Sequence, residues 1–367
     1  MAAEVTRLTA SRNTSDPGDA PPFPHPRSRL RGPWIYAAAL LLLGISLLAG
    51  TTAGTVRIAP GSIVRSIAGN RAALSPVEQT ILIHVRVPRV LAAALIGATL
   101  SLAGGLFQGL FRNPMADPYV LGTSGGAAFG AAFGLFLFPE ATVLGFSAAA
   151  GMAFLGAMIT IFFVYGLARA GGRTPIVPLL LAGMVVSMIL SEASSVLVYL
   201  RDEISWNARN LALWLHGSIS VIEWPQLLCA CAIVLLAGVL CFPLRSVLNV
   251  FALGEEYAQQ LGLRVELARV GVILVASLLT AAAVLLGGII GFVGLLVPHI
   301  VRLIAGPEHG RLLMLSAILG ASYLVIADLL ARTIMAPSEL PVGIITAFLG
   351  GPVLLYLLRR SKREYAL

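Results

Sequence analysis

Apolar runs recur along the chain from Trp34 to Leu358 and are separated by short segments rich in Arg, Pro and Gly. A run of about 20 apolar residues is long enough, as a helix, to cross a hydrocarbon core about 30 Å thick. The pattern predicts ten spans, near residues 34–53, 87–110, 119–138, 143–168, 176–200, 224–244, 268–288, 290–304, 312–331 and 342–359. We therefore expect an all-α polytopic membrane protein.

The apolar stretch from Val270 to Ile304 predicts two helices, because a single helix of that length would extend about 52 Å. Gly287, Gly288 and Gly291 supply the interruption. The second half is short and contains a proline, so we expect a partial helix buried among its neighbours.

Composition and charge add the sidedness of the chain. The chain is 58% hydrophobic and 11% charged, against about 25% charged for an ordinary soluble domain, which excludes a water-soluble fold. When the loops are alternated, 17 of the 25 basic residues fall on one side, together with both termini. The positive-inside rule then predicts cytoplasmic termini.

The two ends of the chain are polar. Residues 1–32 are rich in Pro, Ser, Asp and Arg, and we expect a disordered cytoplasmic tail there. A cleaved signal peptide is the alternative, but the polar lead is long and acidic for one, so we favour an uncleaved first span. A transmembrane domain is expected over 33–360 and a short cytoplasmic tail over 361–367.

Residues that could carry chemistry are sparse. The single lysine, Lys362, lies in a basic tail rather than in G-x-x-x-x-G-K-[ST], so this chain has no P-loop. Cys229, Cys231 and Cys241 lack metal-ligand spacing, the five histidines are scattered, and no hydrolase motif is present. We expect no enzyme activity, no metal site, no bound cofactor and no nucleic-acid partner.

Small residues recur at every fourth position in two predicted spans. They are Gly97, Ser101, Gly105 and Gly109 in the second span, and Gly122, Gly126, Gly130 and Gly134 in the third. Such stripes let helix backbones approach closely in lipid. We favour tight helix contact, with a permeation path lined by small residues as the alternative.

Two carboxylates fall within predicted spans, where a charge is costly unless it faces protein or water. Asp328 precedes Arg332 by four residues, a spacing that predicts an intrahelical ion pair. Glu192 has no basic neighbour within a turn, and lining a path or bonding between helices are equally open. An ion-coupled secondary transporter would use one of these carboxylates as its proton site.

A polar segment interrupts the apolar pattern at about 251–263. Leu253, Tyr257 and Leu261 form a helical stripe there, and Gly254 and Gly262 bound the segment. A short amphipathic helix outside the membrane would suit docking to a soluble partner, and an ordinary solvated loop is the alternative.

Several long motifs, in order over residues 35–360, resemble the FecCD-type permeases of ATP-binding-cassette (ABC) importers, which take up iron chelates and vitamin B12. The motifs are Arg86-Val87-Pro88-Arg89, Gln108–Pro118, Leu121–Gly126, Leu181–Gly183, Trp214–Ser218, Gly254–Leu263, Gly291–His299 and Glu339–Gly343. The resemblance implies the type II ABC importer permease fold, with ten helices per subunit. It also implies a homodimer with two ATPase subunits and a solute-binding protein, in the bacterial inner membrane, with ATP and Mg on the ATPase.

The resemblance further implies roles for individual residues. The coupling helix that seats in the ATPase would comprise Leu253, Gly254, Glu255, Glu256, Tyr257, Ala258, Gln259, Gln260, Leu261 and Gly262. Arg86 and Arg332, assisted by Arg89, would be exposed on the outer side and meet acidic residues of the binding protein, with interfacial anchoring as the alternative. The translocation path and its gates would include Thr174, Pro178, Ser187, Ser191, Glu192, Ser195, Trp214, Leu215 and His216.

The resemblance also bears on the cargo. Ferric siderophore, haem and cobalamin are all carried by this family. An acidic residue at position 192 is unexpected for a vitamin B12 permease, so an iron chelate, either haem or a siderophore, is the favoured substrate and cobalamin is the alternative.

Overall fold

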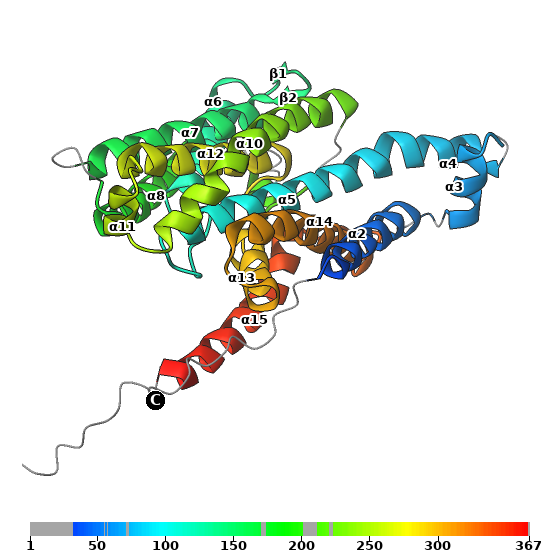
Figure 1. Cartoon of the computed structure of the whole chain (residues 1–367). Helices are drawn as coiled ribbons and strands as arrows, with labels where there is room; N and C mark the ends of the chain where they lie inside the picture. The colour runs from blue at the N-terminus through cyan, green and yellow to red at the C-terminus, as the bar shows by residue number, and fades with distance from the viewer. Residues whose placement is uncertain are drawn as a thin grey trace, which may run out of the picture.

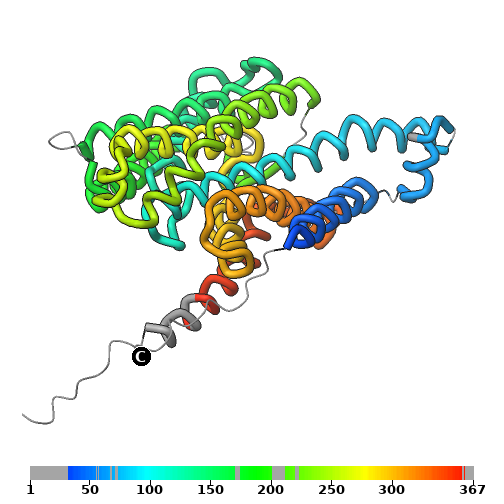
Figure 2. The backbone as a smooth tube through the Cα atoms, in the orientation of Figure 1, coloured from blue at the N-terminus to red at the C-terminus, as the bar shows by residue number. Residues whose placement is uncertain are grey.

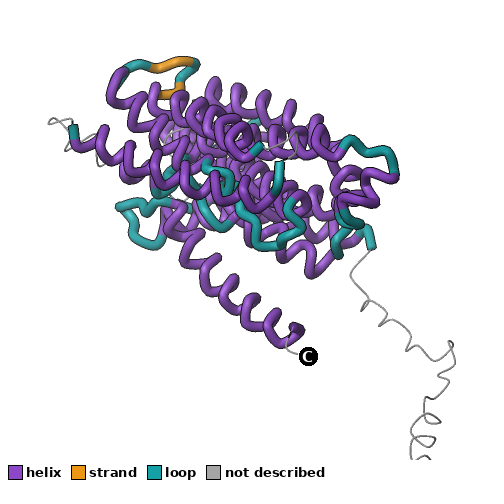
Figure 3. Tube along the Cα trace, turned by 90° about the vertical axis from the view of Figure 1, so that its left-hand side faces the viewer, coloured by secondary structure: helices purple, strands orange, loops and turns teal. Residues whose placement is uncertain are grey.

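The computed structural model describes residues 32–54, 56, 58–70, 73–169, 174–200, 211–219 and 223–365. Within these residues the chain is helical apart from turns and one small hairpin, formed by β1 (Thr142–Val143) and β2 (Phe146–Ser147) (Figure 3). Residues 1–31 of the predicted N-terminal tail lie outside the described residues. The all-α class predicted from the apolar runs is confirmed.

Ten apolar helices match the ten predicted spans. Seven are long enough to cross a membrane: α2 (Trp34–Thr52), the continuous helix Pro76–Leu110, α7 (Ala148–Ala168), α8 (Ile176–Tyr199), α10 (Trp224–Phe251), α12 (Val265–Gly287) and α14 (His309–Thr333). Three are shorter in their apolar part: α6 (Thr123–Leu137), α13 (Val293–Ala305) and α15 (Val342–Tyr365). Helix α15 continues five residues beyond the predicted boundary at 360, into the segment expected to be a tail.

The second span begins earlier than its apolar run predicts. Helix α4 (Pro76–Thr80) leads through a π-helical stretch, η2 (Ile81–Arg86), directly into α5 (Val87–Leu110), so the backbone runs as one long rod (Figure 2). A capping box starts this rod: the Ser75 hydroxyl accepts from the Glu78 N–H, and the Glu78 carboxylate accepts from the Ser75 N–H. The first turn of this rod is polar, so the hydropathy pattern does not indicate the extension. The separate helix α3 (Pro60–Ile67) is polar too and was not predicted, for the same reason.

Helix α5 is the centre of the bundle and contacts α10, α12, α13 and α14. Its glycines bring backbones together: a methyl group at Gly97 would collide with the carbonyl oxygen of Gly320 in α14, and one at Gly104 with that of Gly294 in α13. In α6, a methyl group at Gly130 would meet the Met152 carbonyl of α7 in the same way. Glycines of both stripes therefore make close helix contacts, as favoured above.

The predicted break between α12 and α13 is confirmed. Gly288 ends α12 with φ +69, and Phe292 precedes α13 with the same left-handed φ of +69. Ile290, between them, is buried. Irregular backbone of this kind is tolerated within a membrane protein where the protein itself buries it.

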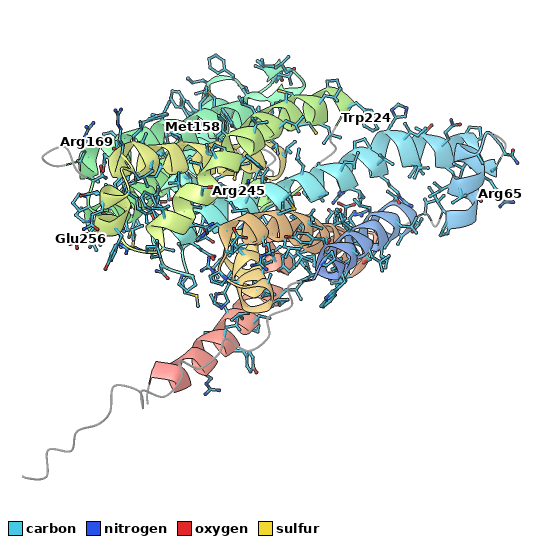
Figure 4. All side chains as sticks on the ribbon, in the orientation of Figure 1. Arg65, Met158, Arg169, Trp224, Arg245 and Glu256 are labelled. Carbon is cyan, nitrogen blue, oxygen red and sulfur yellow. The ribbon has the colours of Figure 1, made fainter. Side chains whose placement is uncertain are left out.

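The bundle has two distinct ends. Figure 4 places Arg169 and Glu256 at one end and Arg65 and Trp224 at the opposite one. The short helix α11 (Glu255–Gln260) lies at the first end and α3 at the second (Figure 1). We refer to them as the α11 end and the α3 end.

Candidate transport site and coupling surface

Helix α11 and the residues that flank it present an apolar stripe to their surroundings. The helix has six residues, fewer than the stretch of about 251–263 expected, because Gly254 at φ +113 and Gly262 at φ +81 turn the chain on either side. Ala258 faces the body and is fully buried. Leu253, Tyr257 and Leu261 are each more than 60% exposed. Of the other polar positions in the predicted coupling segment, Glu256, Gln259 and Gln260 are exposed as well.

One arginine ties α11 to the body. Arg269, in the second turn of α12, is 5% exposed. Its Nη2 lies 2.7 Å from Glu255 Oε1 of α11, and its Nη1 lies 2.8 Å from Glu266 Oε2. The same Nη1 donates to the backbone carbonyl of Thr174 at 2.8 Å. Sequence reasoning missed Arg269, because two of its three partners, Glu255 and Thr174, lie on other segments of the chain.

The Glu266 carboxylate extends this cluster. Its Oε1 accepts from the Thr174 hydroxyl at 2.5 Å and from the Tyr165 hydroxyl of α7 at 2.8 Å. Thr174, predicted as part of an inner gate, is fully buried by these contacts. We name Tyr165, Thr174, Glu255, Glu266 and Arg269 the Arg269 cluster.

A cleft of about 850 Å³ opens beside the Arg269 cluster. One wall is the start of α8, including Pro178, which is exposed, and the other wall includes Gln259 and Arg264. Both predicted gate residues line this cleft, but they differ in exposure, since Thr174 is fully buried in the cluster and Pro178 is exposed.

Helix α8 separates its serines onto different faces. Ser187 is directed at α6, where its hydroxyl accepts from the Gly125 N–H at 3.1 Å and lies 3.3 Å from the Ser124 hydroxyl. Glu192 and Ser195 are exposed. Ser191 is half-buried, and its carbonyl accepts from the Ser195 hydroxyl at 3.2 Å. Ser187 therefore contacts α6, and its place on the translocation path stays a prediction.

The predicted outer gate is partly described, since residues 207–210 and 220 lie outside the described ranges. Trp214 and Leu215 are half-buried against a cluster that includes Ala127 of α6 and Ala281 of α12. His216 is exposed, with Nδ1 2.7 Å from the Ala212 carbonyl oxygen. The next residue, Gly217, accepts from the Gly343 N–H at 3.2 Å, which joins this segment to the start of α15.

Two of the three arginines expected to be exposed are buried. Arg86 is 5% and Arg332 7% exposed, and both reach the last turn of α2. Arg86 donates to the carbonyls of Thr51, Thr52 and Val56, and Arg332 donates to that of Gly50. The carbonyls at a helix C-terminus lack intrahelical partners and attract cations. The expectation of exposure is wrong because the end of α2 supplies these acceptors.

Two carboxylates, Asp328 and Glu339, pair with Arg332 and Arg89 beside Arg86. Asp328 Oδ2 lies 2.9 Å from Arg332 Nε, which confirms the predicted intrahelical pair. Arg89 lies 3.0 Å from Asp328 Oδ1 and 2.8 Å from Glu339 Oε2, and of these two acidic side chains only Glu339 is substantially exposed. We name Arg86, Arg89, Asp328, Arg332 and Glu339 the Asp328 cluster.

An acidic cap at the α11 end was also missed. Glu308 precedes α14, and its carboxylate accepts from the N–H groups of Gly310 and Arg311 and from the Asn249 amide. Partial burial acts to raise the pKa of Glu308, but these donors outweigh it and hold the pKa at about 2. An acidic residue directly before an apolar run was the available signal.

The bundle of apolar helices, with a short amphipathic helix outside it and a charge cluster at each end, is that of a multi-pass membrane protein. The model of the FecCD transport family matches residues 40–360, and the chain belongs to that family. It is 42% identical over 281 residues to the cobalamin import system permease protein BtuC of Halobacterium salinarum, covering 77% of this chain and 74% of that protein. It is 39% identical over 285 residues to the hemin transport system permease protein HmuU of Yersinia pestis, covering 77% and 84%.

A solved structure agrees with this assignment. The chain superposes on a metal-chelate type ABC transporter in an inward-facing conformation with a TM-score of 0.79 and 30% identity, covering 90% of this chain and all of that one. The chain is therefore an ABC importer permease with the type II fold, and ATP hydrolysis belongs to a separate subunit. This membership contradicts the alternative of an ion-coupled secondary transporter.

Proposed function

We propose that two copies of this chain associate with two ATPase subunits and a solute-binding protein to import a metal chelate by alternating access. The complex lies in a bacterial inner membrane, with the α11 end and both termini in the cytoplasm. The basic residues favour this orientation, since 17 of 25 fall on the side of the termini. ATP and Mg bind to the ATPase, and this chain holds no cofactor.

The exposed stripe on α11 is the observation that carries the proposal. Leu253, Tyr257 and Leu261 lie outside the predicted spans, where water would surround them. Apolar side chains gathered on an aqueous surface mark sites of protein contact, and aromatic residues are frequent anchors there. We therefore assign α11 as the coupling helix that seats in the ATPase.

The proposed cargo is a ferric siderophore or haem, with cobalamin as the alternative. Relatives named for hemin, Fe(3+)-citrate and cobalamin support a chelate, and Glu192, Ser195 and His216 are exposed for contact with it. The visible absorption spectrum of the solute-binding protein, recovered with the complex from its host, tests this. An iron-chelate or haem band supports the assignment, a corrinoid band selects the alternative, and a colourless ligand contradicts both.

The α3 end is the proposed docking surface for the solute-binding protein. Arg86 and Arg332 support it from below by fixing the end of α2, while the Arg89–Glu339 pair lies nearest the surface. Electrostatic pairing with a complementary partner gives orientation and speed of association more than affinity.

Removing the α11 stripe tests the proposed coupling. Tyr257→Ala with Leu261→Ala should reduce recovery of the ATPase with the permease about tenfold or more, because alanine substitution at aromatic anchors costs about 2 kcal/mol or more. Val64→Ala with Val143→Ala removes exposed apolar side chains near the opposite end and is the matched control. Undiminished ATPase recovery with the α11 variant would refute the role of this helix.

A further inference from the structure

The start of α8 and the helix α11 have no direct chain connection, yet one side chain bonds to both. Helix α11 joins α12 through four residues, so any displacement of α11 reaches α12 along the backbone. It can reach α8 only through non-covalent contacts, such as the bond from Arg269 to the Thr174 carbonyl. The cleft beside the Arg269 cluster separates the two elements elsewhere.

The geometry of Arg269 goes beyond what a local ion pair requires. Glu266, three residues earlier on the same helix, already provides an intrahelical partner at 2.8 Å. Arg269 directs its second terminal nitrogen to Glu255 of α11 at 2.7 Å and a bond to the Thr174 carbonyl at 2.8 Å. A planar guanidinium can hold three acceptors in a fixed arrangement, which a lysine ammonium on a flexible stem cannot.

Thr174 is held at two points, which makes it a firm attachment. Its carbonyl accepts from Arg269, and its hydroxyl donates to Glu266. Thr174 is fully buried and lies two residues before α8 begins at Ile176. A shift of the Arg269 guanidinium would therefore displace the start of α8, including Pro178 at the mouth of the cleft.

Helix α11 depends on the same arginine. Among its six residues only Ala258 is buried, and Glu255 supplies its ion pair with α12. Arg112, the second cation near Glu255, is 4.0 Å away and largely exposed, so it holds α11 less firmly. Buried charge-assisted hydrogen bonds are stronger and less screened than exposed ones.

We propose that Arg269 is the positioning residue that transmits movement of α11 to the start of α8, so that the ATPase-facing helix and the inner gate at Thr174–Pro178 move together. This inference rests on the proposed coupling role of α11. It assigns the transmission to one guanidinium and its two carboxylate partners, Glu255 and Glu266.

Two cysteine reporters in the full complex with its ATPase subunits test the relay without knowledge of the cargo. In a background lacking Cys229, Cys231 and Cys241, Gln260→Cys reports on α11 and Val177→Cys on the start of α8, both positions being exposed. The rate of modification by a membrane-impermeant maleimide is compared without nucleotide and after trapping with ATP and vanadate. In the parent complex both rates should change, by about fivefold or more if the elements are coupled in the usual range.

Arg269→Gln should abolish the nucleotide response at Val177→Cys and leave the response at Gln260→Cys. The matched control is Arg264→Gln, the same substitution at an exposed arginine on the same cleft, and it should retain both responses. Should Arg269→Gln prevent folding, Thr174→Val removes only the hydroxyl bond to Glu266 and should reduce the Val177→Cys response by at least half. A general loss of stability would alter the modification rate at both reporters, so a loss of response at Val177→Cys alone indicates a specific effect.

The outcomes separate the two proposals. A full response at both reporters in Arg269→Gln and in Thr174→Val overturns the relay while leaving α11 as the coupling helix. The absence of any nucleotide response at Gln260→Cys in the parent complex overturns the coupling role of α11, and the relay with it.

Discussion

The Asp328 cluster and the Arg269 cluster are both networks of arginine and carboxylate, at opposite ends of the bundle, but they differ in what they hold. At the α3 end, Arg86 and Arg332 are buried and donate hydrogen bonds to backbone carbonyls in the last turn of α2. At the α11 end, Arg269 reaches out to a six-residue helix that is mostly exposed.

The difference teaches that burial of a charge does not by itself indicate one role. Asp328 is 1% exposed and closed in by Arg89 and Arg332, so every partner is fixed to a long helix. Glu255 and Glu266 are 37% and 27% exposed, and one of them belongs to an element with few attachments. The Asp328 cluster is suited to holding long helices in one fixed arrangement. The Arg269 cluster is suited to a contact that allows α11 to move.

Loss of Asp328 should have the largest effect on stability. Asp328→Ala leaves the buried Arg332 guanidinium without its carboxylate partner and Arg89 with Glu339 alone, and removing one partner of a buried pair costs about 3–5 kcal/mol. The measurement is the unfolding free energy of the purified permease in detergent, followed by the loss of its monodisperse fraction. A cost below about 1 kcal/mol would contradict the description of this cluster as a fixed contact between long helices.

Loss of Arg269 should cost less than loss of Asp328. Arg269→Gln should destabilise the permease alone by about 1–3 kcal/mol, because the two carboxylates left behind can be hydrated. The same unfolding assay gives the comparison directly. An Arg269→Gln variant less stable than Asp328→Ala would reverse the contrast between the clusters.

The cap at Glu308 should contribute a smaller and pH-dependent amount. Glu308→Ala should cost about 1 kcal/mol at pH 7, as loss of an N-cap usually does. The folded pKa of about 2 lies below the unfolded value of 4.5, so the carboxylate stabilises the fold above pH 4.5 and loses this effect as the pH falls toward 2. The difference between variant and parent should therefore shrink between pH 5 and pH 3, and a constant difference would contradict the cap.

The exposed edge of the Asp328 cluster should matter least. Glu339→Gln should change the unfolding free energy by no more than about 0.2–1 kcal/mol, since Glu339 is exposed and its pairing with Arg89 is screened. Raising the salt concentration should remove even this difference, while the effect of Asp328→Ala should persist. An effect of Glu339→Gln as large as that of Asp328→Ala would show that the two carboxylates act as one unit.

Hydropathy and spacing predicted most of the fold and part of the site. All ten apolar helices, the break after Gly287 and the Asp328–Arg332 pair follow from local patterns, because each depends on residues within one or two turns. The start of the second span was missed because its first turn, Pro76–Thr80, is polar.

The long-range contacts could not be predicted in this way. Arg86 is separated by thirty residues or more from the carbonyls it binds, and nothing in its own neighbourhood indicates burial. Arg269 lies 95 residues from Thr174, and Ser187 lies 62 from Gly125. Charge counting assigned arginines to a side of the membrane, but their partners are set by the arrangement of helices.

The direct backbone contacts of α5 with α13 and α14 give the bundle a fixed internal reference distance. At Gly97 against Gly320 and at Gly104 against Gly294 the helix backbones meet directly, which leaves the helices little freedom to slide. A spectroscopic distance between α5 and α14 should therefore stay constant through a transport cycle. Distances from α5 to α8 or α11 can be compared with that constant distance, so a change in them can be assigned to α8 or α11 themselves.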